Sequence, residues 1–154
     1  TDSSVISNAD FAVVCVDTPV DMDTKKPRMD ILQGAVRSIG QNIKPGALVS
    51  IESTLPPLTM KNMVIPIIEN ESGLTAGKDF SVAHCPERVM PGRLLSNLAN
   101  YDRVLGGLDE RSIEMGVELY SHTPNCIRPI YCRPRWPRRS RTRTAMCRSP
   151  SPTR

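Results

Sequence analysis

The segment HCPERVMPGR, from His84 to Arg93, places a carboxylate and a guanidinium side by side between two prolines. Proline fixes φ and lacks a backbone donor, so Glu87 and Arg88 can continue neither a helix nor a central strand. Such a segment presents its side chains to a cleft or to solvent. A carboxylate in a closed cleft can transfer protons, and an arginine fork binds anionic groups. Glu87 and Arg88 are therefore the first candidates for chemistry.

Two threonines follow apolar runs in the same way. The run Phe11–Val16 is followed by Thr18, and the run Ala47–Ile51 is followed by Thr54. Taken singly, a Thr-Pro pair after a strand is usually a turn, and a Glu-Arg pair in a loop is usually a solvated ion pair. Three successive strand ends that carry hydroxyls or charges nevertheless favour a ligand site.

The pattern of apolar residues predicts an α/β fold with a parallel sheet. Buried strands are expected at Phe11–Val16, Ala47–Ile51, Phe80–Ala83 and Arg103–Gly107. Amphipathic helices are expected to begin at caps formed by Asp30, Thr59 and Asp109. Gly40 should close the first helix, and Pro66 should bend the second. Strands that alternate with helices form parallel sheets with right-handed crossovers. Ligands then collect at the carboxyl ends of the strands, where the candidate residues lie.

The charge is distributed unevenly along the chain. The 154 residues carry a formal net charge of +4, but eight of the 20 basic residues are arginines between Arg133 and Arg154, where no acid occurs. The rest of the chain holds 12 basic against 16 acidic residues, a net of −4. We expect residues 1–131 to form the folded part and residues 132–154 to be a disordered Arg/Pro/Ser-rich tail, because the tail has too few apolar residues to offset its ordering entropy.

Cysteine usage and hydropathy exclude several classes of protein. The five cysteines form no CxxC pair, and the two histidines add no zinc-finger spacing, so we expect no metal site. We find neither a signal-peptide pattern nor an apolar run long enough to span a bilayer. The expectation is a cytoplasmic protein, or a piece of one, with reduced thiols and no membrane partner.

Four motifs in order, VCVDTPVD, SIESTLPPLTM, HCPERVMPGRLL and YDRVLGG, resemble the UDP-glucose/GDP-mannose dehydrogenase family, with the CPERV segment most like its UDP-N-acetyl-D-mannosamine branch. The resemblance covers roughly Ala9 to His122. It implies the later part of a Rossmann-like NAD-binding domain, in an enzyme that oxidises the C6 alcohol of a UDP-sugar to a carboxylate with two NAD. The full-length parent is then expected to be a homo-oligomer.

The resemblance also implies roles for individual residues. Thr18 and Thr54 would contact the NAD cofactor, Arg88 and Val89 would hold the UDP-sugar substrate, and Glu87 would lie near the reacting carbon to assist proton transfer or position water. These roles suit the chemistry of hydroxyl, guanidinium and carboxylate groups.

Two parts of the family pattern are missing. No glycine-rich GxGxxG fingerprint occurs, and it is expected upstream of Thr1; the family's nucleophilic cysteine and central-helix lysine and asparagine are expected downstream of the matching region. Cys85, which ends an apolar run, is interpreted as a packing residue and not as that nucleophile. We therefore expect the fragment alone to be inactive.

The tail has its own interpretation. Written in GC-rich codons and read with a one-base displacement, it can give LPTAVAEEVANAYRDVSQSVANA, which resembles the family's central helix; the single codons of Trp136 and Met146 fit this reading. We interpret residues 132–154 as the product of a frameshift near Tyr131. If the tail is genuine, the alternative is a basic-tailed nucleic-acid-binding module, a partner that we do not expect, or a non-catalytic interaction protein.

Overall fold

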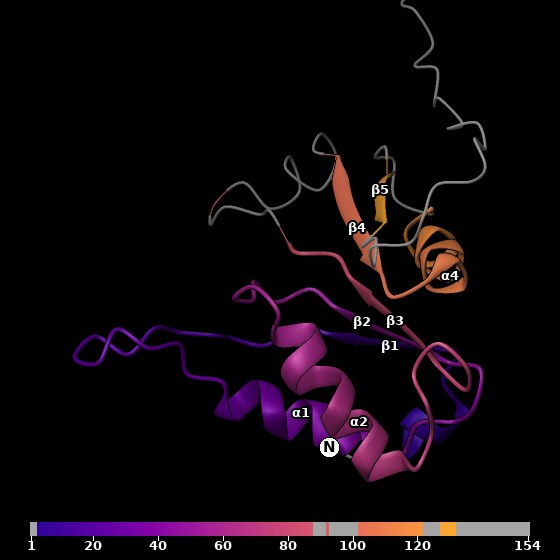
Figure 1. Cartoon of the computed structure of the whole chain (residues 1–154), viewed down its shortest axis with the longest axis horizontal. Coiled ribbons are helices and arrows are strands. Elements are labelled where there is room, and N and C mark those ends of the chain that lie inside the picture. The colour runs from indigo at the N-terminus through magenta and orange to yellow at the C-terminus, as the bar shows by residue number, and fades with distance from the viewer. Residues whose placement is uncertain (1–2, 88–91, 93–101, 122–126, 132–154) are drawn as a thin grey trace, which may run out of the picture.

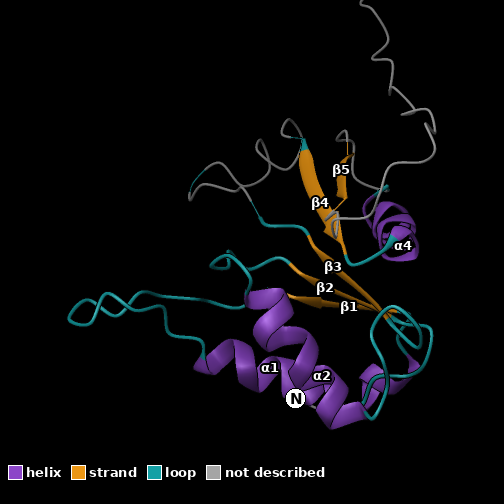
Figure 2. Ribbon diagram, viewed as in Figure 1, coloured by secondary structure: helices purple, strands orange, loops and turns teal. Residues whose placement is uncertain are grey.

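The computed structural model describes residues 3–87, 92, 102–121 and 127–131. Arg88, Val89 and the tail at 132–154 lie outside these ranges, so the predictions made for them stay predictions. The fold is a mixed five-stranded sheet with helices on both faces (Figures 1 and 2). The predicted α/β class is confirmed.

The strands follow one another across the sheet in chain order. They are β1 (Phe11–Val14), β2 (Leu48–Ile51), β3 (Ser81–His84), β4 (Arg103–Gly107) and β5 (Ile127–Tyr131). Strands β1, β2 and β3 are parallel, as are β4 and β5, but β4 runs antiparallel to β3. The expectation of a wholly parallel sheet was wrong at this pair, because a strand's composition does not set its direction and an antiparallel neighbour needs no crossover helix. β5 was not predicted.

Helices cover the two faces of the sheet unequally. Helix α1 (Asp30–Gly40), the π-helical segment η2 (Met60–Val64) and α2 (Ile65–Ser72) lie against β1–β3, whereas α4 (Glu110–Tyr120) lies on the opposite side against β3, β4 and β5 (Figure 1). A 3₁₀ segment, η1 (Ser3–Asn8), precedes β1. The chain between β1 and α1 projects away from the sheet (Figure 2).

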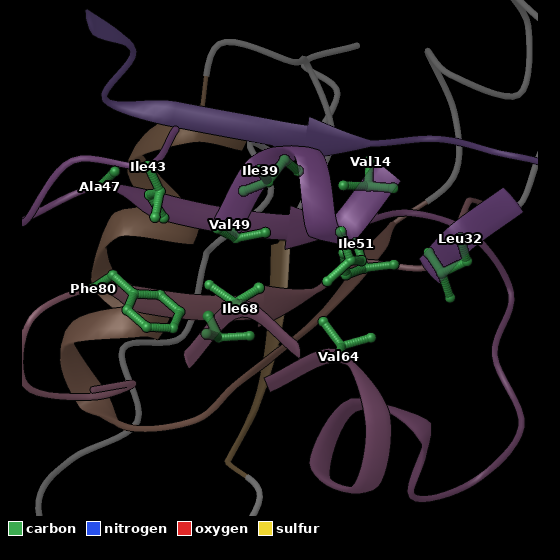
Figure 3. Packing of buried hydrophobic residues seen from close by; sticks show 12 residues of the cluster. Val14, Leu32, Ile39, Ile43, Ala47, Val49, Ile51, Val64, Ile68 and Phe80 are labelled. Atoms are coloured by element: carbon green, nitrogen blue, oxygen red, sulfur yellow. The ribbon is translucent and has the colours of Figure 1, made fainter. Parts of the chain in front are cut away.

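Strand β2 is buried on both faces, which explains its continuous apolar run. Val49 and Ile51 join the larger core under α1 and α2, and Leu48 joins a smaller core under α4. Figure 3 shows side chains of the larger core, with Phe80, Ile68 and Val49 packed together.

Only one of the predicted helix caps is formed by a side chain. The Asp109 Oδ1 accepts a hydrogen bond from the Ser112 backbone N–H at 2.7 Å and caps α4 as predicted. Asp30 is instead the first residue of α1, whose N-cap is Met29, and it pairs with Arg28 at 3.2 Å. Thr59 precedes η2 in helical conformation, and its hydroxyl donates to the Pro56 carbonyl at 2.8 Å. The side chains of Asp30 and Thr59 therefore bond to a neighbouring residue and do not cap a helix.

The predicted disturbance at Pro66 takes the form of a change in helix type. Pro66 lies in the first turn of α2, where the missing N–H of proline costs little, and the turn before it is π-helical.

Gly40 does not end α1 by a left-handed turn, as its place in the sequence suggested; it lets α1 approach α2. A Cβ there would lie 2.7 Å from the Cβ of Glu71 and 3.3 Å from the Cα of Ile68. We expect Gly40→Val to lower the free energy of unfolding by about 1–3 kcal/mol, because the helices must separate. Gly34, on the same helix with nothing within 4 Å, is the matched control.

Urea unfolding followed by circular dichroism measures both variants. Gly34→Ala should leave stability unchanged or raise it by about 0.5–1 kcal/mol, because alanine is the better helix former. Equal stabilities for Gly40→Val and the parent chain would contradict the close approach of α1 and α2.

Candidate active site

The ends of β1 and β2 are joined by a buried serine. Ser53 is 7% exposed, and its hydroxyl accepts a hydrogen bond from the Val16 N–H at 3.0 Å and donates one to the Val16 carbonyl at 2.7 Å. One side chain thus satisfies both backbone groups of the residue that leads out of β1. This fixes the chain segments that carry the two predicted threonines.

Thr18 and Thr54 lie next to each other at this edge. The Thr18 hydroxyl donates to the Thr54 carbonyl at 2.9 Å. Thr54 is exposed and Thr18 is half-buried. The Thr18 hydroxyl oxygen keeps its capacity to accept a hydrogen bond, and the predicted proximity of Thr18 and Thr54 is observed.

Glu87 reaches the same edge from β3. Its backbone N–H donates to the Glu52 carbonyl at 2.9 Å, directly after β2, so the third strand end is tied to the second. Its side chain lies 3.7 Å from Arg103, measured from Oε2 to Nη1. The structure thus brings Thr18, Thr54 and Glu87 to one edge, whereas Arg88 and Val89 are outside the described residues.

Two residues of this edge, Glu52 and Arg103, were not predicted as site residues. Nη1 of Arg103 lies 3.4 Å from Oε1 of Glu52, and their side chains are only 13% and 14% exposed. The antiparallel direction of β4 places Arg103, its first residue, beside the chain that leaves β3. The available signal was Glu52 itself, an acid directly after a fully buried strand.

An aromatic platform lies beneath the guanidinium. The Cζ of Arg103 is 5.0 Å from the centroid of the Tyr120 ring, a cation–π distance. The Tyr120 hydroxyl and the buried Ser50 hydroxyl are 2.8 Å apart and share a hydrogen bond. Strand β2 and helix α4 therefore fix the ring on which Arg103 rests.

Burial dominates the titration of the neutral groups in this cluster. Burial raises the pKa of the Cys85 thiol, and the neighbouring Arg103 opposes that rise in part. Burial likewise raises the pKa of Tyr120, opposed by its hydrogen bond with Ser50. Cys85 is fully buried and packs against β4 and α4 residues, in agreement with its interpretation as a packing residue.

These two pKa shifts predict loss of stability at alkaline pH. A group whose pKa is raised by folding stabilises the native state below its unfolded pKa, and this contribution is lost as the pH rises toward the folded value. The ordinary values are 9.0 for cysteine and 10.0 for tyrosine, so stability should fall progressively above about pH 9. Urea midpoints between pH 7 and 11 measure the effect.

Tyr120→Phe and Cys85→Ala remove the two titrating groups in turn. Each variant should lose less stability than the parent chain between pH 9 and 11, even if its stability at pH 7 is lower. Identical pH slopes for the parent and both variants would contradict the assignment.

A leucine in the segment after Thr54 adopts a backbone conformation that favours glycine. Leu58 has φ of 68° and is 67% exposed, so the strain of its backbone is not offset by burial of its side chain. We expect Leu58→Gly to raise the free energy of unfolding by about 0.5–1 kcal/mol, the strain relieved less the added entropy of the unfolded chain. Exposed Val20, which has no positive φ, provides the control: Val20→Gly should give no gain in thermal or urea unfolding.

The two threonines and three of the described glycines lie at different edges of the sheet. The Thr18 and Thr54 oxygens offer polar contacts at the carboxyl ends of the strands. Gly46, Gly73 and Gly77, which have positive φ, precede β2 and β3 at the opposite edge. These three glycines therefore supply no phosphate-binding turn beside the threonines.

Fold and site together define a nucleotide-binding α/β domain with an acidic group at the carboxyl edge of its sheet. Residues 1–124 match the model of the NAD binding domain of the UDP-glucose/GDP-mannose dehydrogenase family. The chain belongs to this family, as its four motifs indicated.

Named relatives agree with the family assignment. UDP-N-acetyl-D-mannosamine dehydrogenase from Pyrococcus horikoshii is 40% identical over 115 residues, which cover 75% of this chain and 27% of that protein. The protein of the same name from Methanocaldococcus jannaschii is 42% identical over 114 residues, covering 73% and 25%. The chain thus spans about a quarter of the length of these relatives.

A solved structure shares the fold closely. NDP-N-acetyl-D-galactosaminuronic acid dehydrogenase from Methanosarcina mazei Go1 superposes with a TM-score of 0.79 at 45% identity, over 83% of this chain and 28% of that one. The Rossmann-like class is therefore confirmed.

In the described part of the chain, no helix is long and apolar enough to cross a membrane. The same residues contain no group of three or more His, Cys, Asp or Glu side chains that could hold a metal ion.

Proposed function

We propose that this chain is part of an NAD-dependent UDP-sugar 6-dehydrogenase that converts UDP-N-acetylmannosamine to UDP-N-acetylmannosaminuronate. The reaction adds one water oxygen to C6 and reduces two NAD to two NADH, with release of protons. The proposal rests on one observation: Thr18, Thr54 and Glu87 follow strand ends at the same edge of the sheet, in a domain of this family. The names of the archaeal relatives support the choice of sugar.

Each residue has a role that suits its chemistry. Glu87 accepts a proton from the substrate or from the water that becomes the new oxygen. Thr18 and Thr54 bind polar groups of NAD, and Arg88 with Val89 binds the UDP-sugar, the guanidinium pairing with its anionic part. When bound, NAD supplies the hydride acceptor.

The proposal is tested in a hybrid enzyme. Residues 1–124 of this chain replace the matching segment of the Pyrococcus horikoshii relative, and NADH formation is followed at 340 nm with UDP-N-acetylmannosamine. We expect turnover by the hybrid and none by the 154-residue chain alone, which contains about a quarter of the relatives' length. An inactive hybrid that is folded and binds NADH would overturn the proposal.

The sugar is tested in the same assay. UDP-N-acetylgalactosamine is the informative competitor, because a similar structure is named for an N-acetylgalactosaminuronic acid product. A higher kcat/KM for that sugar would move the proposal to it, and a preference for UDP-glucose would reject both N-acetyl sugars.

Two further parts of the proposal concern the parent protein. We propose a cytoplasmic homo-oligomer as the full-length enzyme, which light scattering of that enzyme would test. We also propose that the chain comprises a partial dinucleotide-binding domain at 1–131 and a frame-shifted tail at 132–154. Sequencing the gene across Tyr131 tests the second part, and an uninterrupted frame would reject it.

A further inference from the structure

We infer that Arg103 and Glu52 are positioning residues that fix the Glu87 carboxylate. The inference deepens the proposed function, since its catalytic meaning rests on the role of Glu87. A single guanidinium nitrogen, Nη1 of Arg103, faces both carboxylates, at 3.4 Å from Glu52 and 3.7 Å from Glu87. These groups come from three separate parts of the chain, which the antiparallel β4 brings together.

The two carboxylates have different surroundings. Glu52 is nearer to Arg103 and only 14% exposed, whereas the Glu87 side chain is farther away and 30% exposed. Glu52 is thus the inner anchor that holds the guanidinium. Glu87 is the outer carboxylate, which a substrate can reach while Arg103 compensates the charge of Glu87.

Glu52 fixes Glu87 by a second route as well. The Glu52 carbonyl accepts the backbone N–H of Glu87 at 2.9 Å, so one residue holds both the main chain and, through Arg103, the side chain. The guanidinium itself lies over the Tyr120 ring, which shares a hydrogen bond with Ser50. Arg103 is therefore held by the Tyr120 ring and by the Glu52 carboxylate. Its planar guanidinium is suited to a contact shared between two carboxylates.

The test uses the full 154-residue chain and the NMR signals of its glutamate side chains. Glu52→Gln keeps the shape and the backbone carbonyl but removes the anchoring charge, and Arg103→Lys keeps the charge but removes the fork. We expect both variants to shift the Glu87 side-chain carboxyl ¹³C signal and to increase the mobility of its side chain. Arg28→Lys, which alters the exposed pair of Arg28 and Asp30, is the matched control and should change neither.

A Glu87 signal that is as sharp and unshifted in Glu52→Gln as in the control would overturn the inference. The amide spectrum reports whether each variant is folded, and the isosteric Glu52→Gln decides the question if Arg103→Lys unfolds. The outcome is independent of turnover: an inactive hybrid enzyme rejects the proposed function, whereas an unresponsive Glu87 signal rejects the positioning role.

Discussion

Replacing Arg103 by methionine is expected to lower the free energy of unfolding by about 3 kcal/mol, which is enough to unfold a marginal domain. The loss arises less from the missing ion pair than from Glu52, which is left 14% exposed with its charge no longer compensated by Arg103. The cation–π contact between the Arg103 guanidinium and the Tyr120 ring is lost as well, and it adds a smaller part. Urea unfolding at pH 7 measures the change.

Two controls separate charge from packing. Arg28→Met removes a pair whose side chains are 57% and 59% exposed, and it should change stability by less than about 0.5 kcal/mol. Adding Glu52→Leu to Arg103→Met should restore at least part of the loss, because the uncompensated charge is gone. A double variant less stable than Arg103→Met alone would argue against the buried charge as the cause.

Replacing Glu87 by glutamine in the hybrid enzyme is expected to lower kcat by about 100-fold or more, the usual contribution of a positioned proton acceptor. The amide keeps the size of the side chain and the backbone hydrogen bond to Glu52, so the fold is retained. KM for NAD should change little. The kcat and KM values from initial rates, measured from pH 6 to 10, test this result.

Glu71→Gln is the matched control, since Glu71 lies on α2 away from the strand ends and contacts Gln41. This variant should keep the activity of the hybrid. A Glu87→Gln hybrid with unchanged kcat across the pH range would remove Glu87 from the proton transfer.

Much of the fold could be predicted because burial leaves a clear pattern in the sequence. Strand β2 is apolar throughout because both of its faces are covered, and α4 begins where Asp109 caps it. The direction of β4 could not be predicted, because Arg103–Gly107 reads alike as a parallel or an antiparallel strand. The cap expected at Asp30 failed because α1 begins at Asp30 itself and has Met29 as its N-cap.

The site residues could be predicted only where the neighbouring sequence marks them. Thr18, Thr54 and Glu87 each follow an apolar run, and their common edge follows from parallel strands. Arg103 is 51 residues from Glu52 in sequence, and a pair at that distance has no local signature. The sequence also gives no hint that Tyr120, at the end of a helix, supports the guanidinium.

The antiparallel direction of β4 gives the ion pairs of Arg103 a rigid origin. Arg103 is placed by strand register, with His84 opposite Gly106, so the sheet itself sets its ion pairs with Glu52 and Glu87. The electrostatic support of Glu87 is thereby as rigid as the hydrogen-bonded strands that carry it.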